Sequence, residues 1–258
     1  MALRFSTGLR NFLNEGGSVK QALNNGKIYI YSGTQPALAN DAASGTLLAI
    51  ITKASGALTE EVQAVGTVSL TGGASGSVDT ITVNGLAILP AAVTFNASLT
   101  QTAVDIVAAI NNNPQNLLFV ATSAVGVVTI TAKPGLGALA NGWVVASTAT
   151  TITKTDANMA GGVTAINGLT FGDAASGTLV KNPLETWTGV GLGVGGTAGW
   201  FRFEGAVADT EAADTTDNLI RLDGNIATSG ANLNMSSTTI ATGATQTIST
   251  FSLTVPAA

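Results

Sequence analysis

The sequence predicts a mainly β protein in which a discontinuous, antiparallel β-sandwich-like outer domain carries an inserted small α+β domain. The first observation is composition. Aromatic residues make up only 5% of the 258 residues, and the abundant small and β-branched side chains favour thin sheets. The second is a series of short alternating apolar segments between turn residues. The third is a change of composition along the chain, because residues 66–163 contain only five charged side chains.

The outer domain is predicted to comprise residues 1–65 and 164–258. Near the N-terminus, Ser6 or Thr7 can cap a short helix, and Ser18 can start a second helical turn. Apolar and polar residues alternate in the segments that follow, which is typical of strands with one buried face. Strands are expected over residues 27–33, 45–54, 199–207, 218–226 and 247–255.

Two of these strands have a clear division of faces. Around residue 200, Phe201 and Phe203 are expected on one face, with Trp200 and Arg202 on the other. This division follows because successive side chains of a strand point to opposite faces. In the C-terminal segment 247–255, Phe251, Leu253 and Val255 alternate with polar residues and are expected on one face.

The inserted domain is predicted to comprise residues 66–163. Asn84-Gly85 between two apolar runs is a strong signal for a hairpin turn, and a second hairpin is expected over 117–133. Between them we expect a helix capped by Thr102, with Asp105 favouring its N-terminus. Its buried face at helical spacing would consist of Ala103, Ile106, Val107 and Ile110.

One octet occurs almost twice, as DAASGTLL at 41–48 and as DAASGTLV at 173–180. The sequences that flank the two copies differ, which favours one domain interrupted by an insertion over an internal repeat. Both copies would then mark loop-to-strand transitions in the outer sheet. Chance similarity remains the alternative, because the whole chain is rich in alanine, glycine, serine and threonine.

Charge and missing residue types exclude several functions. The net charge of −5 argues against nucleic acid and against an anionic membrane surface, because both need clustered lysine and arginine. The chain has no histidine and no cysteine, which removes the commonest general base, the thiol nucleophile and the preferred ligands of zinc. We therefore expect a protein that is not an enzyme and binds no cofactor.

The densest acidic segment is DTEAADTTDN, residues 209–218. Carboxylate oxygens of acidic loops are ligands that calcium accepts, although the spacing here does not fit the EF-hand loop. The alternative is a solvated loop between two strands, since blocks of like charge are usually exposed. The candidate calcium ligands are Asp209, Glu211, Asp214 and Asp217.

Two further patterns have a functional and a structural interpretation. The stretch GLGVGG at 191–196 matches a dinucleotide-binding fingerprint, but a strand follows it instead of the required helix. We interpret it as a glycine-rich connector. Trp187 and Trp200 could stack on a sugar ring, but we expect them to fill a core otherwise made of small side chains.

Long stretches resemble known proteins. DTITVNGLAIL, AAVTFNASLTQTAVDIVAAINNN and FVATSAVGVVTITAKPGLGALANGWVV together resemble a small module of tailed-bacteriophage virion proteins, including many tail sheath proteins. The outer stretches LRFSTGLRNFL, NGKIYIYSGTQPALANDAASGTLL, GLTFGDAASGTLVKN, GTAGWFRF and RLDGNIATSGANLNMSSTTI resemble small phage structural proteins that lack the insertion.

This resemblance implies a structural role in a virion that is assembled in the host cytoplasm. The expected partners are further copies of the chain and other virion proteins, with the strands at 27–33 and 247–255 offered for contacts between copies. A tail or neck position is favoured, and capsid decoration is the rival. A third alternative is an appendage that binds a host receptor or glycan through the acidic loop, Trp187 and the glycine-rich connector.

Overall fold

The computed structural model describes residues 3–254. Strands contain 42% of the residues and helices contain 12%, which confirms the prediction of a mainly β protein. The chain forms two compact units: unit 1 comprises residues 1–61 and 165–258, and unit 2 comprises residues 62–164. The boundaries predicted from sequence lie at 65/66 and 163/164.

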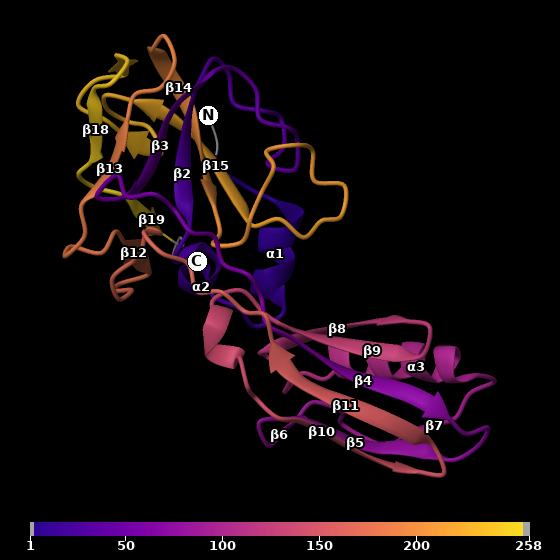
Figure 1. The fold of residues 1–258 in the computed structure, drawn as a ribbon. Helices are drawn as coiled ribbons and strands as arrows, with labels where there is room; N and C mark the ends of the chain where they lie inside the picture. Colours follow the sequence, from indigo (N-terminus) through magenta and orange to yellow (C-terminus); the bar gives the residue numbers. More distant parts are fainter. Residues whose placement is uncertain (1–2, 255–258) are drawn as a thin grey trace. The chain divides into compact units, whose positions relative to one another are not determined.

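Unit 1 is built on one large sheet (Figure 1), whose pairs in the described residues are antiparallel except for β15 with β16. The main order is β1 (Arg4–Phe5), β15 (Arg221–Ala227), β14 (Gly196–Glu204), β2 (Lys27–Ser32), β3 (Leu47–Lys53), β13 (Trp187–Val190) and β18 (Thr245–Ile248). Strand β16 (Leu233–Asn234) pairs with β15, and β17 (Thr239–Ile240) pairs with β14. A separate two-stranded sheet contains β12 (Thr178–Val180) and β19 (Ser252–Thr254).

The apolar core of unit 1 lies on one face of the central strands. Phe201 and Phe203 share one face of β14, as predicted, and are buried in this core together with Ile28 and Ile30 of β2. Phe203 contacts an aromatic group completed by Phe171, Trp187 and Phe251, with ring centroids 5.5–6.1 Å apart. This group fills space that the small side chains of the chain leave open.

Two short helices cover part of this core, α1 (Thr7–Asn14) and α2 (Val19–Leu23). Ser6 caps α1 by accepting a hydrogen bond from the backbone N–H of Leu9 at 3.1 Å, which decides between the two predicted caps. Figure 1 shows α1 beside the end of β15, and Leu9 is buried there. Ser18 caps α2 in the same way through Gln21.

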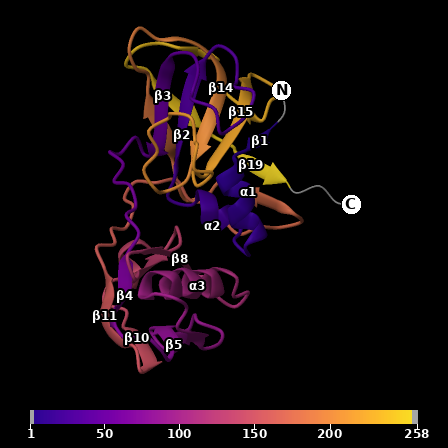
Figure 2. The same ribbon diagram turned by 90° about the vertical axis from the view of Figure 1, so that its right-hand side faces the viewer.

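Unit 2 contains two antiparallel sheets and one longer helix. One sheet has the order β11 (Thr153–Ala160), β4 (Val65–Gly72), β9 (Val127–Ala132) and β8 (Phe119–Ala124). The other has the order β10 (Val145–Thr150), β5 (Ser77–Val83) and β6 (Leu86–Ala87), with β7 (Val93–Thr94) also paired to β5. Helix α3 (Leu99–Asn111) lies beside β8 (Figure 2) and also contacts β9 and β7. A 3₁₀ turn spans Gly137–Ala140.

The local predictions for unit 2 are confirmed except for the helix start and for Val107, which is only partly buried. Asn84 and Gly85 have positive φ angles of 49° and 81° and join β5 to β6, as the turn signal predicts. Helix α3 begins one turn before the predicted cap, because Ser98 accepts the N–H of Gln101 at 3.1 Å. Thr102 is instead buried inside the first turn, where its hydroxyl donates to the carbonyl of Ser98.

One predicted strand of unit 1 is wrong, and another is confirmed as a strand but lies in the interior of the sheet. The segment 247–255 is not one strand, because β18 and β19 belong to different sheets and Phe251 between them turns into the core; Val255 lies outside the described residues. The segment 27–33 forms β2, which lies between β14 and β3. An interior strand has both edges paired, so β2 is not available for contacts between copies.

The two octets lead into strands of different sheets. DAASGTLL leads into β3 of the large sheet, whereas DAASGTLV leads into β12 of the two-stranded sheet. Both are loop-to-strand transitions within unit 1, but the second does not enter the large sheet as predicted. The two octets therefore share a local conformational role without occupying equivalent positions.

Candidate functional site

Strand β14 places polar side chains opposite the apolar core. Trp200, Arg202 and Glu204 alternate with the core residues Phe201 and Phe203. Because opposed residues of paired strands share one face of a sheet, the neighbouring strands extend this polar surface. We call it the charged face; it consists of Lys27, Tyr29 and Tyr31 on β2, Trp200, Arg202 and Glu204 on β14, and Arg221 and Asp223 on β15.

Chain segments on either side of these strands cover the charged face. The Nη2 group of Arg202 donates to the carbonyls of Ala39 and Asp41 at 3.2 and 3.1 Å, and Arg221 donates to the carbonyl of Ala212 at 2.7 Å. Both arginine side chains are 0% exposed. The sequence predicts alternating faces for β14, and the structure shows in addition that both faces are buried.

Each buried arginine is paired with one carboxylate in a two-pronged contact. Arg202 donates to both oxygens of Asp223 at 2.8 Å, and Arg221 donates to both oxygens of Asp209 at 2.6 Å. Burial opposes the charge of Arg202, but its hydrogen bonds and charge attraction to Asp223, together with the nearby charges of Glu211 and Asp209, outweigh this effect and raise its pKa. Such paired geometry is the form in which buried charges are tolerated.

The acidic loop folds back onto this face through its first two acids. Glu211 has a positive φ of 61°, so its backbone N–H reaches the Asp209 carboxylate at 2.9 Å. The side-chain carboxylate of Glu211 accepts a hydrogen bond from the Tyr31 hydroxyl at 2.7 Å. Burial and this hydrogen bond raise the pKa of Tyr31, which remains a neutral donor. Asp209 and Glu211 are thus both brought to the charged face.

The other two predicted calcium ligands have different partners. The Asp214 carboxylate accepts the N–H groups of Thr216 and Leu219 at 3.1 and 3.0 Å. Burial would raise the pKa of Asp214, but these hydrogen bonds lower it. Asp217 accepts the side-chain amide of Asn40 at 2.8 Å. The four predicted ligands therefore do not form one group, and the loop is not simply a run of solvated charges.

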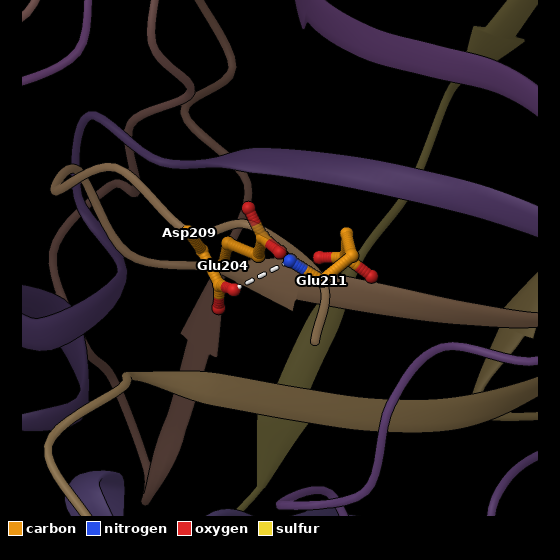
Figure 3. A group of neighbouring side chains, drawn as sticks. All are labelled: Glu204, Asp209 and Glu211. Carbon is orange, nitrogen blue, oxygen red and sulfur yellow. Dashed lines mark hydrogen bonds between the residues drawn. The ribbon is translucent and has the colours of Figure 1, made fainter. Parts of the chain in front are cut away.

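A different carboxylate completes the group that the loop begins. Glu204 of β14, Asp209 and Glu211 each offer an oxygen, and these oxygens lie within 4.8 Å of one another. Figure 3 shows the three side chains together, with the N–H of Glu211 donating to Asp209. We call Glu204, Asp209 and Glu211 the carboxylate cluster. An all-oxygen set of this kind suits a hard cation such as calcium.

Lys27 is the nearest lysine to this cluster. Its Nζ lies 3.4 Å from an oxygen of Glu204 and is hydrogen-bonded to Glu60. Burial opposes the charge of Lys27, but its contacts with Glu60 and Tyr29 prevail and raise its pKa. Lys27 therefore stays charged and is shared between two carboxylates.

Trp187 and Trp200 are both fully buried, but only Trp187 belongs to the apolar core as predicted, whereas Trp200 lies on the charged face. Trp187 donates to Glu185 at 3.1 Å, and Trp200 stacks on Tyr31 with ring centroids 4.6 Å apart. A buried indole cannot stack on a sugar, so Trp187 gives no support to the glycan-binding alternative.

Sequence reasoning missed Glu204, Arg221 and Asp223 as members of the site. The available signal was charge at period two inside otherwise apolar strands, in WFRFE and RLD. A charge at a strand position next to aromatic core residues indicates a buried polar partner. Identifying the partner required the strand register, which places Glu204 opposite both Lys27 and Arg221.

A second feature of unit 1 is an apolar tip on the glycine-rich connector between β13 and β14. We call residues 190–194 the apolar tip; Val194 is 94% exposed there, and Val190 and Leu192 are also exposed. Gly193 and Gly195 flank Val194 with φ angles of 56° and 73°. Thr242 donates to the carbonyl of Gly193 at 2.6 Å, which attaches the tip to the turn before β18. The connector is followed by β14, so the dinucleotide interpretation is excluded.

Comparison with known proteins identifies no family. No protein-family model matches the chain, and no curated protein shows significant similarity to it. Within the described residues, no helix combines the length and the hydrophobicity needed to cross a bilayer.

Proposed function

We propose that this protein is a non-enzymatic structural component of a tailed-phage virion, in which identical copies assemble symmetrically in the tail or neck. The observation that carries the proposal is the apolar tip beside an edge strand. Strand β18 ends the path of the large sheet and pairs with β13, whose Val190 begins the tip. An open strand edge next to exposed apolar side chains is the arrangement that allows one chain to extend the sheet of another.

The distribution of charge supports the same proposal. Only 10% of the residues are charged, and eight of them are Lys27, Glu60 and the paired residues of the charged face and acidic loop. Few charges are left for the rest of the surface, which gives little protection against association. In a long-lived assembly this property is useful.

The tail or neck position rests on unit 2. Its two hairpins and helix α3 contain the stretches that resemble the sheath-associated module. Fold-level resemblance does not fix a position, so capsid decoration is the competing location.

Self-assembly is tested by sedimentation velocity of the purified chain over a range of concentrations. We expect concentration-dependent oligomers that Val194→Asp abolishes, because a charge at a buried contact must be desolvated. The matched control is Val125→Asp, since Val125 is also strongly exposed, at 86%, and lies in a turn of unit 2 with a φ of 48° that aspartate tolerates. A monomer at all concentrations, or equal effects of the two variants, would contradict a role of the tip.

Position in the virion is tested by immunogold electron microscopy of gradient-purified particles from the phage that encodes the chain. Label on the tail or neck supports the proposal. Label over the whole head supports the decoration alternative. Expression during infection without incorporation into particles would contradict a structural role.

A further inference from the structure

The carboxylate cluster contains buried oxygens without hydrogen-bond partners. The Glu204 side chain is 1% exposed, and among the described residues neither of its carboxylate oxygens accepts a hydrogen bond. The Oε1 atom of Glu211 is also buried and accepts no hydrogen bond within the described part of the chain. Leaving buried carboxylate oxygens unpaired is costly, on the order of 1–3 kcal/mol or more for each charged group. A positively charged ligand would therefore stabilise these buried carboxylates.

The balance of charges points to a ligand with two positive charges. Each arginine of the charged face is committed to one acid, Arg202 to Asp223 and Arg221 to Asp209. Arg202 Nη1 reaches Glu211 only at 3.4 Å, and Lys27 is shared between Glu204 and Glu60. The acids Glu204, Glu211, Asp209 and Asp223 exceed the cations Lys27, Arg202 and Arg221 by one negative charge. Glu60, which shares Lys27 and is 36% exposed, adds a second negative charge at the edge of the site.

The geometry suits one ion. Calcium binds carboxylate oxygens at about 2.3–2.6 Å, so two ligands of the same ion lie at most about 5 Å apart. The oxygens of Glu204, Asp209 and Glu211 lie within 4.8 Å of one another. Two ligands come from a loop and one from a strand, and such an irregular set favours calcium over magnesium because magnesium requires stricter octahedral geometry.

We propose that Glu204, Asp209 and Glu211 bind one calcium-class divalent cation between strand β14 and the acidic loop. The ion neutralises Glu204, which no hydrogen bond satisfies, and fastens the loop over the charged face. Water molecules complete the coordination, since three carboxylates supply fewer than the 6–8 oxygens that calcium takes. This site is independent of the proposed virion role, because it acts within one copy of the chain.

The direct test is calcium binding to the full chain after treatment with EDTA. We expect isothermal titration calorimetry with CaCl₂ to give one site per chain, and the thermal unfolding midpoint to rise with calcium concentration. Magnesium should bind at least tenfold more weakly. Terbium offers a second readout, because Tyr31 contacts Glu211 and stacks on Trp200; excitation of these rings should sensitise terbium emission, and calcium should suppress it.

Variants separate the cluster from the rest of the loop. Glu204→Gln should lower calcium affinity at least tenfold, whereas Asp217→Asn should leave it unchanged, because Asp217 is an acid of the same loop outside the cluster. Glu211→Gln, whose side chain is 19% exposed, replaces Glu204→Gln if circular dichroism shows that the latter is unfolded. It should also weaken calcium binding at least tenfold.

Two results would overturn the proposal. One is the absence of calcium-dependent heat and of terbium emission at millimolar concentrations, which would mean that a proton shared among the carboxylates balances the charge. The other is calcium binding that Glu204→Gln and Glu211→Gln leave unchanged. Neither result depends on whether the chain assembles, so failure here and failure of the virion proposal are distinguishable.

Discussion

Replacing Arg202 by methionine tests whether the charged face is a set of matched pairs. The change removes the guanidinium group and keeps much of the apolar volume. Asp223 then loses the two hydrogen bonds of 2.8 Å that Arg202 donates. Asp223 is itself 0% exposed, so its carboxylate stays buried without that partner.

The magnitude follows from which groups lose partners. Ala39 and Asp41 keep a donor, because Arg221 Nη1 also reaches their carbonyls at 3.4 and 3.3 Å. The loss is therefore dominated by the Asp223 carboxylate. Removing one partner of a buried ion pair costs about 3–5 kcal/mol, a large fraction of the roughly 5–15 kcal/mol that stabilises a typical domain.

The second arm of the experiment removes both charges. Arg202→Met combined with Asp223→Leu leaves neither an unpaired carboxylate nor an unpaired guanidinium at this position. Replacing a buried pair by apolar side chains of similar size is often close to neutral. We expect the double variant to recover at least about 2 kcal/mol relative to Arg202→Met, because the coupling between contacting residues is not additive.

Urea unfolding followed by tryptophan fluorescence measures these differences. Trp143 belongs to unit 2, whereas Trp187 and Trp200 belong to unit 1. A Trp143→Phe background therefore makes the signal specific for unit 1, and constant m values will show that the variants differ in stability rather than in compactness. A cost below about 1 kcal/mol for Arg202→Met, or simple addition of the two single effects, would refute the matched-pair reasoning.

Three further predictions concern other parts of the chain. Joining Glu61 to Ala165 through a two-glycine linker should leave unit 1 folded by circular dichroism, because Thr59 and Ile166 already pair through two 3.0 Å hydrogen bonds; a disordered product would show that unit 1 needs unit 2. Burial would raise the pKa of Glu185, but its hydrogen bonds, above all from Thr170, lower it. The ionised Glu185 should therefore stabilise unit 1 at pH values above its unfolded pKa of about 4.3. This stabilisation is lost as the pH falls below that value and through the lower pKa of the folded state. The urea midpoint should accordingly drop more between pH 7 and pH 3 in the wild type than in Glu185→Gln, and equal drops would contradict this. Asn116→Ala should destabilise unit 2 by about 2–3 kcal/mol in urea, because the buried Asn116 amide serves three backbone groups, whereas the exposed Gln115→Ala should change stability by less than about 0.5 kcal/mol.

The parts of the fold predicted correctly are those that neighbouring residues determine. Asn84-Gly85 predicts its turn because few residues tolerate two successive positive φ angles. Ser6 caps α1 for an equally local reason, since its hydroxyl meets an N–H three residues on. The alternation of Phe201 and Phe203 identifies one face of β14 because side chains of a strand point to alternate sides.

The errors arise where tertiary contacts override a local pattern. Residues 247–255 alternate well enough to predict one strand, yet Phe251 packs at 5.9 Å from the ring of Trp187 and breaks the segment. The predicted cap Thr102 fails because Ser98 offers the same chemistry one turn earlier. Neither competition can be decided from the sequence of the segment alone.

The candidate site depends on register and was only half predictable. Asp209 and Glu211 were identified because acidic residues gather in one loop. Glu204 was not, because its place beside Lys27 and Arg221 follows from which strands are neighbours in the sheet. A sequence pattern indicates that a charge in an apolar strand needs a partner, but it does not say which distant residue supplies it.

The charged face also explains how a chain with so few charges selects one strand register. A slip of β14 by one residue would turn Arg202 and Glu204 into the core and Phe203 out of it. It would also break the pairing of Arg202 with Asp223. The charges of Arg202, Glu204 and Asp223 would then be buried without partners, at a cost of several kcal/mol. Small residues such as Ala198 and Gly199 specify register weakly, because they fit either face of a sheet. Concentrating charge at the centre of the sheet therefore fixes the register there, although the apolar tip and strand β18 contain no charged residue.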